Sequence, residues 1–302
     1  MIILFSDPTI CLFFSLLLGL LIGSFLNVVI QRLPIMIDQR WQTEWEHWSQ
    51  TNPVTSHSTD NLLDALPTPR VVKPHSPYNL FYPRSHCPSC LHPIYALQNI
   101  PVLSYCLLKG RCHFCQTSIS WQYPLVEVLC AVLTAYATFR FGYDIHSLGA
   151  IAFCAFMLAM IFIDLNTFYL PDELTLPLLW LGLLFNLGHG FTSLDSAVIG
   201  AALGYFSLWT VFWLFKLTTG KDGMGYGDFK LLAAIGAWLG WQMLPIVILL
   251  SSLTGAFVGI FLMFFKGRNK QEPMAFGPFL GCAGILALFF GSYINQHYLS
   301  MF

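Results

Sequence analysis

An aspartate follows three glycines in the stretch GMGYGDFK, which runs from Gly223 to Lys230 in a chain that is only 10% charged. The residues around Asp228 are mainly apolar, and a carboxylate next to lipid costs enough free energy that it usually serves a function. A second acid, Asp164, ends an uninterrupted apolar run in AMIFIDLNTFYLPD. Two aspartates that share a proton can act as general base and general acid, because like charges close together separate their pKa values. The pair predicts hydrolysis of a peptide bond by the aspartic mechanism.

Each acid also has a simpler interpretation. The glycines before Asp228 allow the backbone to turn sharply and let another segment approach the carboxylate closely, but they also fit a flexible loop followed by a helix cap. Asp172 follows Leu-Pro at the expected start of a helix, where capping alone explains it. A different class of protein, a transporter or channel with a zinc-bound cytoplasmic domain, would use Asp164 and Asp228 to bind a cation or relay protons.

Four cysteines form two closely spaced pairs, CPSC at Cys87 and Cys90 and CHFC at Cys112 and Cys115, with 21 residues between the pairs. Two C-x-x-C pairs can close a tetrahedral zinc site, and the sequence predicts structural zinc here. The alternatives are disulfides or simply buried thiols. A reducing cytoplasm disfavours the disulfides. Histidines beside the pairs could replace a sulfur ligand, although four sulfurs already complete the shell: His86, His92 and His113. The other cysteines are expected to be small core residues: Cys11, Cys106, Cys130, Cys154 and Cys282.

The composition indicates an all-α polytopic membrane protein, since 56% of the 302 residues are hydrophobic and the mean hydropathy is +0.64. The first apolar run, Cys11 to Ile30, is long enough to cross a hydrocarbon core of about 30 Å. It lacks a basic leader and an evident cleavage motif, so we expect a retained span. About eight transmembrane helices are expected, the other seven at Pro124–Phe141, Ser147–Ile163, Leu174–Leu187, Leu194–Phe215, Phe229–Trp241, Met243–Phe265 and Met274–Ile294.

The basic residues predict the orientation in the membrane. On this helix map, every Lys and Arg except Arg140 falls on one side, and basic residues in short loops stay cytoplasmic. Both termini are therefore expected to be periplasmic and the long first loop cytoplasmic. The net charge of −1 provides no broad basic field, so binding to nucleic acid is not expected.

Three parts follow from this map: the first transmembrane helix at residues 1–30, a cytoplasmic domain with the tetracysteine zinc site at residues 31–123, and a membrane-embedded peptidase domain at residues 124–302. The first half of the cytoplasmic domain, Pro34 to Asn79, has no clear period. It is expected to be a loop with one short helix around Gln39–Trp48. No chemistry is evident in residues 35–79.

Several motifs in order resemble those of the prepilin peptidases, also called type IV leader peptidases, which are GxGD membrane aspartic proteases. They are GSFLNVVIQRLP at Gly23–Pro34, YPRSHCPSC ending at Cys90, NIPVLSY at Asn99–Tyr105, GRCHFC ending at Cys115, YPLVE at Tyr123–Glu127, DLNTFYLPDELTLPLLWLGLL at Asp164–Leu184 and GYGDFKLLAAIGAWLG at Gly225–Gly240. The resemblance covers nearly the whole chain. It places the two catalytic aspartates of that family on Asp164 and Asp228. A preflagellin peptidase is a related alternative, against which the tetracysteine segment argues.

The resemblance implies an enzyme of the bacterial inner membrane that cleaves the leader of type IV prepilins and of type II secretion pseudopilins on the cytoplasmic side. It also implies N-methylation of the new terminal residue with S-adenosylmethionine as methyl donor. No Gly-rich nucleotide loop of Rossmann type precedes a strand, so the sequence does not locate the methyl donor. Glu127, four residues into the second span, is a candidate for accepting the proton that the new terminal amine must lose before it is methylated. Alternatively, it pairs with a loop cation such as Arg111 and pins the loop to the membrane.

Overall fold

The computed structural model describes residues 8–51, 78–95, 100–188, 190–221, 223–266 and 274–299. Within these ranges the chain is helical and contains no β-strand, only two isolated bridges. The predicted all-α fold is therefore confirmed. Most of the predicted loop between Pro34 and Asn79 lies outside the described residues, as do four of the basic residues that predicted the orientation: Arg70, Lys73, Arg268 and Lys270.

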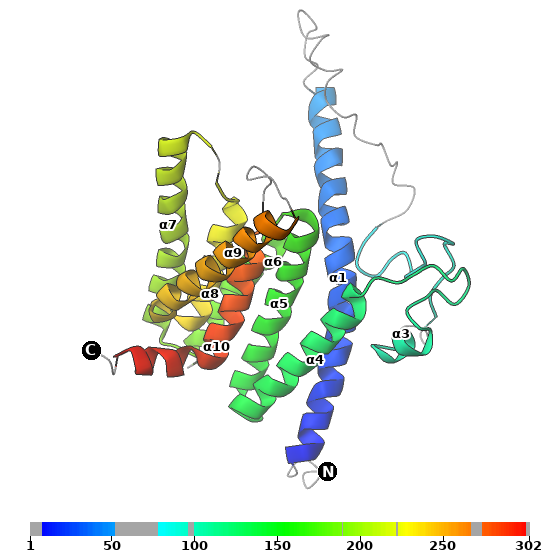
Figure 1. Cartoon of the computed structure of the whole chain (residues 1–302), viewed down its shortest axis with the longest axis horizontal. Coiled ribbons are helices and arrows are strands. Elements are labelled where there is room, and N and C mark those ends of the chain that lie inside the picture. Colours follow the sequence, from blue (N-terminus) through cyan, green and yellow to red (C-terminus); the bar gives the residue numbers. More distant parts are fainter. Residues whose placement is uncertain are drawn as a thin grey trace, which may run out of the picture.

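The first helix, α1, extends well beyond the predicted span, from Pro8 to Thr51. Its 44 residues correspond to about 66 Å at 1.5 Å per residue, roughly twice the thickness of a hydrocarbon core. The helix continues through Pro34 and through the boundary placed after residue 30, and the short helix expected around Gln39–Trp48 is its last part. Leu33 and Ile37 are buried, because this first part of the extension still packs on the bundle. The rest of α1 rises above the other helices (Figure 1).

Seven further helices of 14 to 26 residues follow in the predicted order. Five helices within the described residues are long and apolar enough to cross a membrane: α1, α4, α5, α7 and the segment that contains α9. Two others, α6 and α8, have only 16 and 14 residues and cannot span a bilayer by length alone. The bounds are α4 Gln122–Phe141, α5 Ile145–Thr167, α6 Asp172–Leu187, α7 Leu194–Thr219, α8 Tyr226–Leu239, α9 Leu244–Lys266 and α10 Gly277–Leu299, with the short helix α3 at Leu103–Leu107.

The helices form two groups that share α5. On one side, α1 packs along α4 and α5; on the other, α8 lies among α6, α7 and α10 (Figure 1). The segment that carries the four cysteines lies on the far side of α1 from α7 and α8 (Figure 1). The predicted peptidase residues and the predicted zinc site are thus separated by α1.

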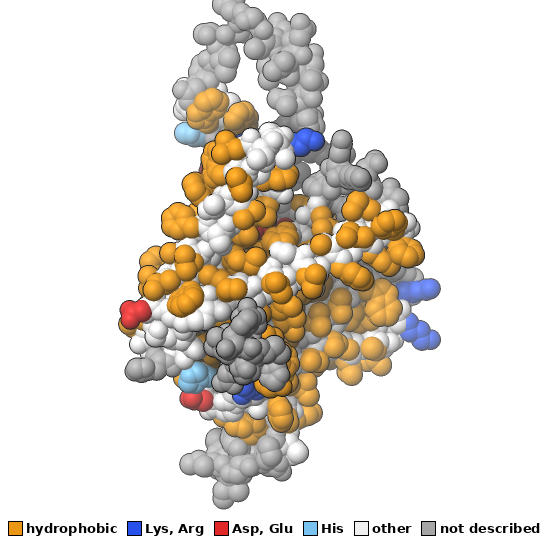
Figure 2. Space-filling model, turned by 60° about the vertical axis from the view of Figure 1, so that its left-hand side comes forward, with side chains coloured by type: hydrophobic (Ala, Val, Ile, Leu, Met, Phe, Trp, Pro, Cys, Tyr) orange, Lys and Arg blue, Asp and Glu red, His pale blue; other side chains and the backbone are white. Residues whose placement is uncertain are grey.

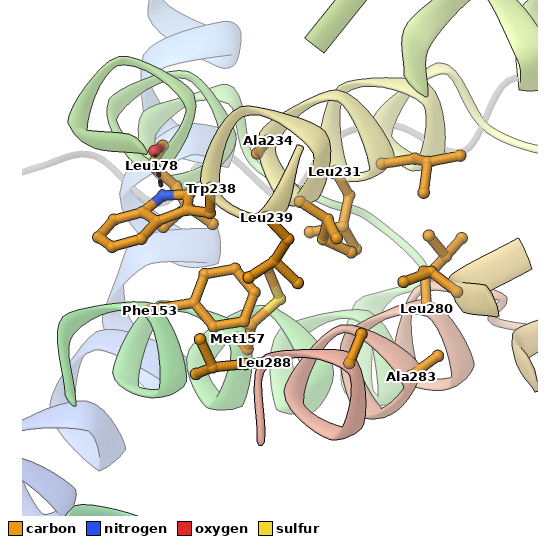
Figure 3. Close-up of a cluster of buried hydrophobic side chains, with 14 of the residues drawn as sticks. Phe153, Met157, Leu178, Leu231, Ala234, Trp238, Leu239, Leu280, Ala283 and Leu288 are labelled. Atoms are coloured by element: carbon orange, nitrogen blue, oxygen red, sulfur yellow. Dashed lines mark hydrogen bonds between the residues drawn. The ribbon is translucent and has the colours of Figure 1, made fainter. Parts of the chain in front are cut away.

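The short helix α8 is the centre of the core. Eleven of its residues are buried, including Asp228. Side chains from four helices meet there (Figure 3), with Phe153 and Met157 from α5, Leu178 from α6 and Leu280 from α10. The indole Nε1 of Trp238 donates a hydrogen bond of 2.8 Å to the carbonyl oxygen of Leu178, which satisfies the only polar atom of that side chain. This packing holds α8 in place although the helix is too short to span a bilayer.

The outer surface is apolar over a broad area. In Figure 2 hydrophobic side chains cover most of the visible face, and charged side chains gather near its edges. Large hydrophobic residues that are at least two-thirds exposed include Phe257, Phe264, Phe265, Leu217 and Phe139. A soluble monomer rarely exposes so large an apolar patch, whereas a lipid-facing bundle requires one.

Candidate active site and metal centre

Asp164 lies in the last turn of α5, whose length from Ser147 onward is largely buried. Its side chain is only 5% exposed. The helix ends after Thr167 because Phe168 adopts a left-handed conformation, with φ of 55°, and donates its backbone N–H to the carbonyl oxygen of Asp164 at 2.9 Å. The chain then turns through Leu170 toward α6. The acid is therefore fixed at the end of a rigid central helix.

Asp228 lies in the first turn of α8 and is 6% exposed. Gly225 is the N-cap residue, and the backbone N–H of Asp228 donates to its carbonyl oxygen at 3.3 Å. The glycine at position 227 has a packing reason, because a Cβ there would lie 2.7 Å from the Cβ of buried Leu170. The glycine at position 227 therefore allows the start of α8 to lie close to the turn after α5, as the close-approach interpretation expects.

The structure brings the two predicted acids together. Asp164 and Asp228 lie close enough for their charges to interact, although 64 positions separate them in sequence. Leu170 lies between the turns that carry them. In addition, Oδ2 of Asp164 is buried and has no hydrogen-bond partner among the described residues. A buried carboxylate oxygen without a donor is costly, and a shared proton or a water molecule would satisfy it.

Gly277 completes this site and was missed by the sequence analysis. It is the first residue of α10, and a Cβ at this position would lie 2.6 Å from Oδ2 of Asp164 and 3.1 Å from Cδ1 of Leu170. The backbone of Gly277 also interacts favourably with the charged form of the Asp164 carboxyl group. Both acids thus lie beside the N-terminal turn of a helix, where backbone N–H groups favour negative charge. The only sequence signal was the Gly-Pro pair at the start of the last span.

Asp172 has a different role from the predicted cap. The N-cap residue of α6 is Pro171, and no side chain caps this helix. Instead, both carboxylate oxygens of Asp172 accept hydrogen bonds of 2.7 Å from Nζ of Lys230. Lys230 is two residues after Asp228, so this ion pair joins the start of α6 to the turn that carries the second acid. The next residue, Glu173, pairs with Arg40 of the α1 extension at 3.2 Å.

The four predicted zinc ligands converge. Their sulfur atoms lie within 4.8 Å of one another, and among the described residues this is the group of side chains that could hold a metal ion. Cys87 is buried, and the other three are more accessible. None of the three neighbouring histidines joins the cluster; the ring of His92 instead packs against that of Phe114, with centroids 3.5 Å apart and planes tilted by 40°. The set of four thiols fits a tetrahedral thiophilic metal ion such as zinc.

The two cysteine pairs form two copies of the same local structure, 25 residues apart. In the first copy, Cys87 N donates to His92 O at 3.0 Å and Leu91 N to Cys87 O at 2.9 Å; in the second, Cys112 N donates to Thr117 O at 2.8 Å and Gln116 N to Cys112 O at 3.0 Å. Leu91 and Gln116 have nearly identical positive φ angles of 57° and 58°. We call these copies the first and second knuckles, residues 85–94 and 110–119.

The environment favours the thiolate at Cys115 and Cys87 but not at Cys90, whose pKa is raised to about 11 because desolvation and the neighbouring sulfur atoms outweigh a backbone contact with His92. The Thr117 hydroxyl, 3.2 Å from Sγ, and the Thr117 backbone lower the pKa of Cys115 to about 6. Backbone contacts with Cys90 and Ser89 lower the pKa of Cys87. Thiolates are the form that binds zinc. Of the five cysteines outside the cluster, Cys11, Cys130 and Cys154 are buried as expected, whereas Cys106 and Cys282 are exposed.

Glu127 is buried at the start of α4 and contacts the segment between the knuckles. Its Oε2 accepts a hydrogen bond of 2.7 Å from the backbone N–H of Val102, which has a positive φ of 58°. The side chains of Ser24 and Asn27 on α1 also contact this carboxyl group. If Glu127 pins this segment to the membrane helices, it does so through the backbone N–H of Val102 and not through Arg111.

Comparisons with known proteins match two successive segments of the chain to described families. Residues 17–141 match the family described as the Bacterial Peptidase A24 N-terminal domain, and residues 151–260 match the Type IV leader peptidase family. A protein of Aeromonas hydrophila named prepilin leader peptidase/N-methyltransferase is 53% identical over 293 residues, which cover 96% of this chain and 95% of that protein.

More distant relatives carry the same name. One from Stutzerimonas stutzeri is 46% identical over 97% of this chain and 96% of its own length, and one from Burkholderia pseudomallei is 48% identical over 92% and 85%. No solved structure matches. These findings favour the peptidase hypothesis over the transporter hypothesis. The chain belongs to the type IV leader peptidase family.

Proposed function

We propose that this protein cleaves the leader peptides of type IV prepilins and type II secretion pseudopilins, and then N-methylates the new terminal residue. The name shared by relatives with 46 to 53% identity supports both activities. The observation that carries the peptidase activity is the pair of buried acids, Asp164 and Asp228, at the ends of α5 and α8. No soluble substrate is required, because a prepilin contains a hydrophobic helix that can enter the bilayer beside this bundle.

The two acids divide the chemistry of hydrolysis. One carboxylate accepts a proton from water while the water oxygen attacks the scissile carbonyl carbon. The other carboxylic acid donates its proton to the carbonyl oxygen, which gives a neutral tetrahedral intermediate. Collapse of this intermediate breaks the C–N bond, and a carboxyl group protonates the departing amine. Two carboxyl groups that share one proton supply both functions, and the positive ends of α8 and α10 stabilise the remaining negative charge.

The tetracysteine segment supplies the second activity in this proposal. Zinc would be held by Cys87, Cys90, Cys112 and Cys115, where it would cross-link the two knuckles and have no open position for chemistry. S-adenosylmethionine would supply an electrophilic methyl group. The zinc would be structural: it would hold the second knuckle to the first, next to the segment whose Val102 N–H is bound by Glu127.

The distribution of basic residues supports a location and an orientation in the membrane. We place the protein in the bacterial inner membrane as a multi-pass protein, with both termini periplasmic and the knuckles cytoplasmic, because basic residues in short loops stay on the cytoplasmic side. Its partners are prepilins, pseudopilins and the lipid bilayer, and the net charge of −1 gives no reason to expect nucleic acid. Both acids then lie near the cytoplasmic boundary, where a leader would emerge.

Mass spectrometry of a prepilin incubated with the purified full-length protein tests both activities at once. Without S-adenosylmethionine we expect the cleaved pilin, and with S-adenosylmethionine we expect the same product heavier by one methyl group at its N-terminus. A prepilin that remains full length would contradict the peptidase assignment and favour the transporter hypothesis. Cleavage without any added methyl group would contradict the methyltransferase assignment alone.

A further inference from the structure

A cavity of about 1110 Å³ lies between α3, the second knuckle and the start of α4. Its lining includes two aromatic rings, Tyr105 and Trp121, and two cations, Lys109 and Arg111. The rings lie close together, with centroids 5.8 Å apart. We call this space the α3 cavity. Neither the peptidase mechanism nor the zinc site uses its lining residues.

The α3 cavity lies at the expected membrane boundary and is built on fixed elements. Trp121 directly precedes α4, and Pro124 within α4 forms part of the wall. Val102 forms another part, and its backbone N–H is held by buried Glu127. The hydroxyl of Tyr105 donates to the carbonyl oxygen of Ile119 at 3.4 Å, which joins α3 to the second knuckle. The cavity therefore depends on both Glu127 and the zinc-bound fold.

We propose that the α3 cavity binds S-adenosylmethionine, an inference that rests on the proposed methyltransferase function. The ligand has an adenine ring, a carboxylate and a sulfonium cation, and the lining offers a partner for each. Trp121 and Tyr105 can stack on adenine and attract the sulfonium through their ring faces. Lys109 and Arg111 can bind the carboxylate by charge-assisted hydrogen bonds. Ligand cavities are typically about 300–1,000 Å³, so this one has room for the donor and for the pilin terminus that accepts the methyl group.

The two knuckles have the same local structure, but only residues of the second knuckle line the α3 cavity. The segment just before the first knuckle is held against α1, where Arg32 donates hydrogen bonds to Pro83 O at 2.6 Å and Asn79 O at 2.9 Å. Arg84 immediately precedes the first knuckle as Lys109 immediately precedes the second, 25 residues later, and both are exposed basic residues. Arg84 does not line the cavity, whereas Lys109 does. The difference provides a matched control within the same chain.

The α3 cavity is separate from the pair of acids. Figure 1 shows α3 on the other side of α1 from α8, which carries Asp228. A pilin that has been cleaved at the acids must therefore shift its new N-terminus before it reaches the methyl donor. Variants of the cavity should accordingly change methylation and leave cleavage intact.

The reaction balances without a further reagent. The pilin α-amine, whose unperturbed pKa is about 7.7–8.0, first loses a proton to water. The amine nitrogen then forms a bond to the methyl carbon while the bond between that carbon and sulfur breaks. The electron pair of the broken bond stays on sulfur, which gives neutral S-adenosylhomocysteine. The methylated amine carries the positive charge.

Direct binding to the zinc-loaded full-length protein tests the proposal. Radiolabelled S-adenosylmethionine, cross-linked by ultraviolet light, should label peptides within residues 100–124. Lys109→Gln combined with Arg111→Gln should raise the Kd at least about tenfold, the change that 1.4 kcal/mol produces. Arg84→Gln should leave the Kd unchanged. The ligand should also protect Cys106, an exposed cysteine in the cavity wall, from alkylation. Zinc content and prepilin cleavage should stay at wild-type levels in every variant.

Three results would overturn the proposal. If the double variant binds S-adenosylmethionine with the wild-type Kd, or the label maps outside residues 100–124 while methylation persists, the donor binds elsewhere and only this inference fails. If the double variant loses co-purified anionic phospholipid but not S-adenosylmethionine, the cavity is a lipid headgroup site. If the wild-type protein neither binds the donor nor methylates a cleaved pilin, the proposed methyltransferase function fails as well.

Discussion

The backbone of Gly277 lies directly against the carboxyl group of Asp164, although the two residues start and end different helices. A Cβ at position 277 would be 2.6 Å from Oδ2, a distance that real Cβ atoms essentially never show. The first turn of α10 therefore determines the position of one of the two acids. The start of α10 thus belongs to the surroundings of the proposed active site.

Gly277→Ala should therefore reduce cleavage, because either the acid or the start of α10 must move. A displacement of about 1 Å at a catalytic group can cost about a hundredfold in rate, and we expect a loss of about that size. Initial rates of prepilin cleavage measure it. Gly255→Ala is the matched control, since a Cβ on that glycine meets its nearest atom at an ordinary 3.5 Å. Equal cleavage rates for both variants would show that α10 does not position Asp164.

Asp164→Asn and Asp228→Asn should each lower cleavage to below about a hundredth of the wild-type rate, since positioned acid–base groups contribute about 10²–10⁴-fold. The double variant should be no slower than either single variant, because the acids act as one unit. Both single variants should retain zinc and methylate a cleaved pilin. Retention of more than about a hundredth of the rate in either variant would refute the assignment of the pair.

Asp172→Asn serves as the control for this experiment. It removes a carboxylate at the start of α6, but its ion pair with Lys230 is partly exposed, with side chains 47% and 29% accessible. Such pairs contribute about 0–1 kcal/mol. We expect a mild loss of cleavage, far smaller than that of the two buried acids.

The two acids and the four cysteines were predictable because residue type and spacing identify them without a partner. A carboxylate at the end of an apolar run, or two C-x-x-C pairs, is unusual wherever it occurs. Gly277 was not predictable, since its role depends on which helix packs beside Asp164. The pairing of Asp172 with Lys230, 58 residues away, was not predictable either, because it also depends on which helices pack together.

The length of α1 was also missed, and for a different physical reason. Its second half has no apolar period, so the pattern of residues 31–51 does not distinguish a helix from a loop. In the structure this half continues a helix already nucleated in the membrane, and continuation costs far less than nucleation. Leu33 and Ile37, buried against the bundle, stabilise the first turns beyond the predicted boundary.

The metal prediction is one zinc ion per chain. Cys87→Ser, Cys90→Ser, Cys112→Ser or Cys115→Ser should each abolish it, because structural zinc sites require four ligands. The two knuckles should lose protection from proteolysis, while the membrane helices remain folded. Elemental analysis of the purified protein measures the metal, and Cys106→Ser, in the same segment but outside the cluster, should retain it. Iron in place of zinc, or native knuckles without metal, would contradict the assignment.

The last prediction concerns Glu127 and decides between its two interpretations. Its contact with the N–H of Val102 supports a positioning role, in which the carboxyl group holds the wall of the α3 cavity. A glutamine can still accept this hydrogen bond through its amide oxygen, whereas an alanine leaves a buried N–H unsatisfied, which costs about 1–3 kcal/mol. Glu127→Gln should therefore keep most of the methylation of a cleaved pilin, and Glu127→Ala should lose about tenfold or more.

Both Glu127 variants should cleave prepilin at the wild-type rate, since the Glu127 carboxyl group contacts Val102, Ser24 and Asn27 and neither of the paired acids, and both should retain zinc. A proton acceptor would behave differently, because glutamine and alanine would then impair methylation equally, and raising the pH would restore it as the amine deprotonates unaided. Comparing methylation rates of the two variants between pH 6.5 and about 9, a range that brackets the amine pKa, separates the roles. Equal loss in both variants with recovery at high pH would identify Glu127 as the base and refute the positioning role.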